Sequence, residues 1–83
     1  MPPSIHEFII RALATQAGRG PETVFPLEQR FSETGLDSLD LMELLNEVEE
    51  EFDIRVNDDT VTSETTVGDF IIFVESKVAE NTR

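Results

Sequence analysis

The sequence predicts an all-α fold, an antiparallel bundle of three long helices with one short helix. Three segments carry apolar residues at helical spacing, and turn-rich segments separate them. Strand patterns are weak throughout, and the chain has no repeat or low-complexity tract. Because 83 residues leave no room for a second hydrophobic core, we expect residues 1–83 to form a single domain.

The first helix is predicted over residues 4–17. Ser4 followed three residues later by Glu7 is a capping-box signature. Gly18 ends the helix, and Pro21 prevents its continuation. One helical face gathers the apolar residues, with Leu13 at its flank and Ile10 pointing elsewhere: Ile5, Phe8, Ile9 and Ala12.

A long connection follows over residues 18–37. A connection of this length normally argues against a compact fold. Its apolar residues offer a way to hold it against the helices, and we expect them to lie across the core: Val24, Phe25, Leu27, Phe31 and Leu36.

The second helix is predicted over residues 38–53. Its buried stripe spans about 100° of arc and holds Leu41, Leu44, Leu45, Val48 and Phe52. Its opposite side holds Asp40, Glu43, Glu47 and Glu50, with Leu39 among them and Met42 on the flank. No basic residue lies between Arg30 and Arg55, where nine acidic residues gather.

A short helical turn is predicted within residues 54–65, capped by Asn57, Asp58 or Asp59 and ending near Val61. The last helix is predicted over residues 67–80, with Thr66 and Asp69 marking its start. Its inner face consists of Val67, Phe70, Ile71, Val74 and Val78. Phe73 lies to the side of that face and Ile72 nearly opposite to it, which is unusual for the monomer that we otherwise expect.

Composition limits the function. Lys and Arg number 6 against 18 Asp and Glu, a formal net charge of −12 that argues against nucleic-acid binding and favours a soluble protein with basic partners. Without cysteine there is no disulfide, thiolate chemistry or cysteine metal site. No apolar run approaches the roughly 20 residues of a membrane span, and no signal peptide is visible, so we expect a cytoplasmic protein.

The tripeptide Asp37-Ser38-Leu39 opens the acidic helix, which places Ser38 at or beside the N-cap. Backbone N–H groups are unpaired there and the helix dipole is positive, so a phosphate joined to this hydroxyl would be stabilised. Ser and Asp at a helix start also serve as plain caps, worth about 1 kcal/mol. An exposed Leu39 surrounded by carboxylates favours a docking surface over a cap alone.

The sequence at this point resembles the acyl carrier proteins. Residues 35–44 read Gly-Leu-Asp-Ser-Leu-Asp-Leu-Met-Glu-Leu, and residues 49–54 read Glu-Glu-Glu-Phe-Asp-Ile. Residues 65–70, Thr-Thr-Val-Gly-Asp-Phe, open the last helix as in that family. The resemblance covers about residues 4–80 and is most specific over 35–54.

The resemblance implies that a phosphopantetheinyl transferase attaches 4′-phosphopantetheine to Ser38, and that acyl groups are then carried as thioesters for fatty-acid, polyketide or related lipid biosynthesis. It further implies that acyl-loading and acyl-processing enzymes with basic patches dock on the second helix. The docking residues by position are Asp37, Leu39, Asp40, Met42, Glu43 and Glu47. No catalytic residue and no metal ligand is expected. The absence of cysteine from the sequence agrees with an attached arm, because the reactive thiol must then come from that arm.

Some residues depart from the family pattern, namely Thr34, Asn46, Ile72, Phe73 and the proline-containing segment 20–30. They favour a specialised carrier over a housekeeping one. Two alternatives stay open: an aminoacyl or peptidyl carrier, and an acidic interaction module without the arm. A hydrolase built on Ser38 lacks a base, because the one histidine, His6, is remote in sequence and is expected on the surface.

Overall fold

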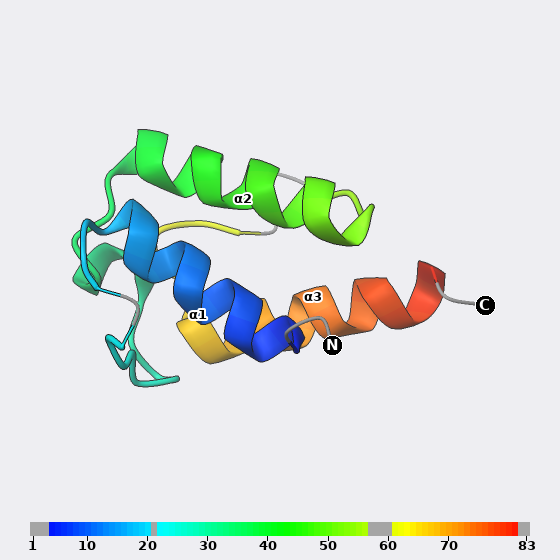
Figure 1. The fold of residues 1–83 in the computed structure, drawn as a ribbon, viewed down its shortest axis with the longest axis horizontal. Helices are drawn as coiled ribbons and strands as arrows, with labels where there is room; N and C mark the ends of the chain where they lie inside the picture. Colours follow the sequence, from blue (N-terminus) through cyan, green and yellow to red (C-terminus); the bar gives the residue numbers. More distant parts are fainter. Residues whose placement is uncertain (1–3, 21, 57–60, 82–83) are drawn as a thin grey trace.

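The computed structural model describes residues 4–20, 22–56 and 61–81. It contains three α-helices, α1 (Ile5–Gln16), α2 (Ser38–Phe52) and α3 (Val67–Asn81), and a 3-10 turn, η1 (Phe31–Glu33). α1 runs opposite to α2 and α3, which share one direction (Figure 1). The predicted all-helical fold is thus confirmed. The pairing is antiparallel for α1 against its two neighbours, whereas α2 and α3 are parallel to each other.

The helix boundaries follow local capping chemistry. The Ser4 hydroxyl accepts a hydrogen bond from the Glu7 N–H at 3.1 Å, and α1 ends just before Gly18, whose φ of +73° disfavours other residues. The Thr66 hydroxyl likewise accepts from the Asp69 N–H at 3.1 Å and starts α3. Each predicted long helix therefore agrees with the structure to within one residue at either end.

The core lies where α1 packs against both other helices, and two edge-to-face phenylalanine pairs help to fill it. The rings of Phe8 and Phe52 are 5.2 Å apart, and those of Phe31 and Phe70 are 5.5 Å apart. Leu13, which was predicted at the flank of the apolar face, is fully buried. Because α1 faces two helices, its buried arc is wider than a single stripe.

Backbone hydrogen bonds hold the long connection to the segment that precedes α3. Four N–H···O contacts of 2.8–3.0 Å join residues 27–32 to residues 63–68. Phe25 and Phe31 are buried as predicted, but Val24 and Leu27 are 83% and 48% exposed. The prediction that all five apolar residues lie across the core was therefore wrong for these two, since backbone pairing supplies the attachment instead.

The predicted short helical turn is not tested by the structure, which shows another short helical element in the connection. The turn expected at residues 57–61 falls largely on residues 57–60, which lie outside the described residues. The short helical element that the structure shows is η1, inside the connection. There the Glu33 carboxylate accepts the Arg30 N–H at 2.9 Å, and the buried Thr34 hydroxyl donates to the Phe31 carbonyl at 2.6 Å. None of the described helices is long and apolar enough to cross a membrane.

Candidate functional site

Ser38 is the first residue of α2, immediately after the N-cap residue Asp37. Asp37 and Asp40 form a reciprocal capping box. The Asp40 N–H donates to Asp37 Oδ1 at 2.8 Å, and the Asp37 N–H donates to Asp40 Oδ2 at 3.4 Å. The two carboxylates that flank the serine are thus engaged with the backbone of the first helical turn, and capping does not require the serine hydroxyl.

The Ser38 side chain is exposed, and its hydroxyl has no hydrogen-bond partner among the described residues. Within the same part of the chain, the backbone N–H groups of Ser38 and Leu39 also lack an acceptor. They point out of the positive end of the α2 dipole. This geometry leaves a reactive oxygen accessible to a second protein and offers two donors to any phosphate joined to it.

A hollow of about 210 Å³ opens beside Ser38. Polar groups and apolar side chains both line it: Phe31, Leu36, Asp37, Ser38, Leu41 and Ser63. Ser63 is brought there by the hydrogen bond from the Ser32 N–H to its carbonyl, at 2.9 Å. The exposed hydroxyl, the free N–H donors and the adjacent open hollow fit the attachment of a long, partly polar arm such as 4′-phosphopantetheine.

The outward surface of α2 unites several of the predicted docking residues. Leu39 and Met42 are 62% and 56% exposed, and Glu43 is exposed beside them. Glu47 is exposed too, but its Oε1 accepts a hydrogen bond from Gln16 Nε2 at 2.8 Å, which ties it to α1. We call the set Leu39, Asp40, Met42, Glu43 and Glu47 the α2 face.

The crowded carboxylates of α2 predict a salt-dependent stability. Glu43 and Glu47 are four residues apart, as are Glu47 and Glu51, and such like-charged pairs destabilise a helix by a few tenths of a kcal/mol each. Added NaCl screens exposed charges over about 10 Å at 0.1 M. We therefore expect the melting temperature, measured by circular dichroism, to rise from low to moderate salt. A melting temperature indifferent to salt contradicts this explanation.

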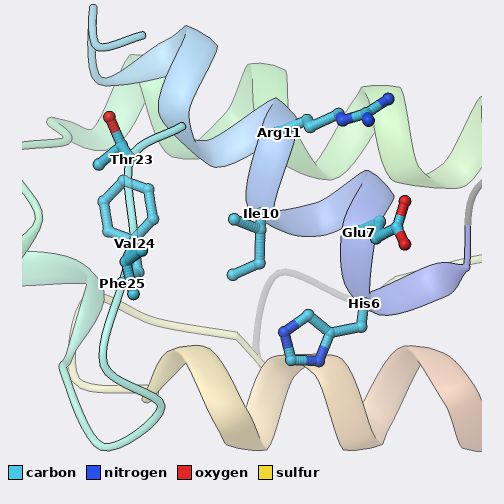
Figure 2. Close-up of a pocket in the computed structure, with 7 residues that line it drawn as sticks. All are labelled: His6, Glu7, Ile10, Arg11, Thr23, Val24 and Phe25. Carbon is cyan, nitrogen blue, oxygen red and sulfur yellow. The ribbon is translucent and has the colours of Figure 1, made fainter. Parts of the chain in front are cut away.

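A second hollow, of about 290 Å³, lies between α1 and the loop 23–25. Figure 2 shows His6 and Ile10 on the edge of α1 that faces this loop, with Phe25 across from them. His6 and Ser38 line different hollows, and no residue is shared between the two linings. The arrangement gives Ser38 no histidine base. Among the residues that the structure describes, no group of three His, Cys, Asp or Glu could hold a metal ion.

Comparison with known proteins identifies the family of the chain. The family described as "Phosphopantetheine attachment site" matches residues 7–74. A protein named acyl carrier protein homolog from Mycoplasmopsis pulmonis is 36% identical over 74 residues, which is 89% of this chain and 96% of that protein. The acyl carrier protein of Streptococcus thermophilus is 34% identical over 74 residues, which is 89% of this chain and 96% of that protein. The acyl carrier protein of Nitratidesulfovibrio vulgaris is 36% identical over 74 residues, which is 89% of this chain and 97% of that protein.

Proposed function

Since the chain belongs to the phosphopantetheine-attachment family that includes the acyl carrier proteins, we propose that Ser38 is the residue that carries the arm. The chain is a carrier of acyl groups and not a catalyst. The observation that carries the assignment to Ser38 is its exposed, unpartnered hydroxyl at the positive end of α2. Intact-mass measurement after exposure to a phosphopantetheinyl transferase and its arm donor tests it.

The chain's own contribution is to present one oxygen. The Ser38 oxygen forms an ester bond to the phosphate of the arm donor while the bond from that phosphate to the rest of the donor breaks. The rest of the donor leaves with the electron pair, and the hydroxyl proton is released. The N–H groups of Ser38 and Leu39 and the α2 dipole stabilise the negative charge that arrives there. Once attached, the arm supplies the terminal thiol that this cysteine-free chain lacks, and acyl groups are held on it as thioesters. The tether raises the effective concentration of the cargo at each enzyme that docks.

The α2 face, with Asp37 beside it, is the surface that we assign to the transferase and to the acyl-loading and acyl-processing enzymes. Leu39 and Met42 supply apolar contact, and the surrounding carboxylates attract a basic patch. Basic partners also match the net charge of −12. We further infer that residues 1–83 act as a single monomeric domain in a specialised biosynthetic pathway.

Reversing the charge of Glu43 tests the α2 face. The Glu43→Lys variant is expected to slow modification of Ser38 about tenfold at low salt, because it places a cation against a cationic partner and lowers the association rate. Glu43 is exposed, so the helix should remain folded. The rate is measured from the mass-resolved fraction modified over time.

The matched control for this charge reversal is Glu80→Lys, an identical change on an exposed residue of α3. At the same low salt it is expected to leave the rate within about twofold of the wild-type value, because it changes the net charge equally but leaves the α2 face intact. Equal rates for both variants would mean that the docking surface lies elsewhere than on the α2 face.

A further inference from the structure

We propose that the chain has a second protein-docking surface, on the outward side of α3, for a partner with an apolar centre and a basic rim. Among the described residues, five large apolar side chains are exposed, and two of them, Leu39 and Met42, belong to the α2 face. Two others, Leu27 and Ile72, are 48% and 62% exposed and belong to no site described so far. α2 and α3 lie on opposite sides of α1 (Figure 1).

Leu27 and Ile72 lie on the same side of the start of α3 although 45 positions separate them in the sequence. The Gly68 N–H donates to the Leu27 carbonyl at 2.8 Å, and a Cβ placed on Gly68 would lie 3.2 Å from the Leu27 Cβ. Leu27 therefore sits directly over Gly68. Ile72 is one helical turn further along α3, and helix side chains lean toward the N-terminus, so Ile72 leans back toward Gly68 and Leu27.

The rim of this patch is acidic. Glu28 follows Leu27, Asp69 follows Gly68, and Glu75 lies three residues beyond Ile72 on the same side of α3; all three are exposed. Lys77 is the one basic residue in α3, and its Nζ lies 5.7 Å from the centre of the Phe73 ring. At 100° per residue it is about 140° around the helix from Ile72. We call Leu27, Glu28, Asp69, Ile72 and Glu75 the α3 patch.

The acidic rim of the α3 patch indicates which kind of partner binds there. A second copy of this chain would bring three carboxylates against three carboxylates, on molecules that each carry a net charge of −12, and like charges oppose such a contact. A partner whose apolar centre is surrounded by lysine or arginine satisfies both the leucine–isoleucine pair and the rim. Since the α2 face lies on the other side of α1, such a partner could bind while an enzyme occupies α2.

An amphipathic helical peptide of leucine and lysine is the probe. Titration into the unmodified, isotope-labelled chain is expected to shift amide signals of α2 and also those of residues 27–30 and 68–76, with two peptides bound per chain by calorimetry. The Ile72→Ser variant should weaken binding at the second site at least tenfold and leave the α2 signals responding as before. The matched Leu39→Ser variant should weaken binding at the α2 face and leave the signals of residues 27–30 and 68–76 responding as before.

Two results would overturn the proposal. One is that the amides of residues 27–30 and 68–76 do not respond, or respond equally in Ile72→Ser. The other is a dimer in sedimentation experiments that Ile72→Ser abolishes, which would make the α3 patch a contact between copies. The peptide titration does not involve modification of Ser38. A negative titration therefore leaves the proposal that Ser38 carries the arm unaffected, and an unmodified Ser38 leaves the proposed α3 patch unaffected.

Discussion

Replacing Ser38 with alanine is expected to abolish modification by a phosphopantetheinyl transferase completely. The wild-type chain should gain the mass of one phosphopantetheinyl group, whereas Ser38→Ala should keep its unmodified mass at every time point. The reason is chemical, because the variant has no oxygen at the position where the phosphate ester must form. The capping box of Asp37 and Asp40 does not use the serine hydroxyl, so α2 should start normally in the variant.

The matched control is Ser63→Ala, which removes a second exposed hydroxyl from the same hollow. This variant should still be modified once per chain. Circular dichroism of both variants should superimpose on the wild-type spectrum. A Ser38→Ala chain that still gains the full mass would show that another residue carries the arm, and an unmodified wild-type chain would favour an acidic interaction module.

Truncating Phe31 should produce a large loss of stability. Its side chain is 1% exposed, it packs edge-to-face on Phe70 at 5.5 Å, and it starts η1 beside the Ser38 hollow. Phe31→Ala is expected to lower the free energy of unfolding by about 3–5 kcal/mol. For a domain of this size each kcal/mol lowers the melting temperature by about 4–8 °C, so a fall of more than about 10 °C is expected.

Val24→Ala is the control for this truncation, because Val24 lies in the same connection and is 83% exposed. Its effect should stay within about 0.5 kcal/mol. Urea denaturation followed by circular dichroism measures both variants. A loss below about 1 kcal/mol for Phe31→Ala would contradict the packing described for the Phe31–Phe70 pair.

The sequence predicts the helices well because their signals are local. Ser4 and Thr66 accept N–H groups three residues ahead, and each marks a helix start to within one residue. The exposure of Leu39 follows from the period of α2 in the same way. Such features depend on neighbours within one or two turns, so a single sequence contains the information that decides them.

Features that depend on distant parts of the chain were not predicted. Ser63 lines the Ser38 hollow only because its carbonyl pairs with the Ser32 N–H. Leu27 is exposed because its backbone, rather than its side chain, is held against Gly68. No spacing or composition signal indicates which loop carbonyl meets which N–H, so these contacts emerge only from the three-dimensional structure.

The hydrogen bonds between residues 27–32 and residues 63–68 also affect the order in which the protein can mature. They join residues that are 31 to 41 positions apart in the sequence, and such nonlocal pairing forms late because chain entropy opposes it. On a ribosome, the connection that leads into Ser38 has no pairing partner until the start of α3 has been synthesised and released from the exit tunnel. A transferase that needs the finished turn before α2 therefore meets its substrate only after the start of α3 has left the tunnel.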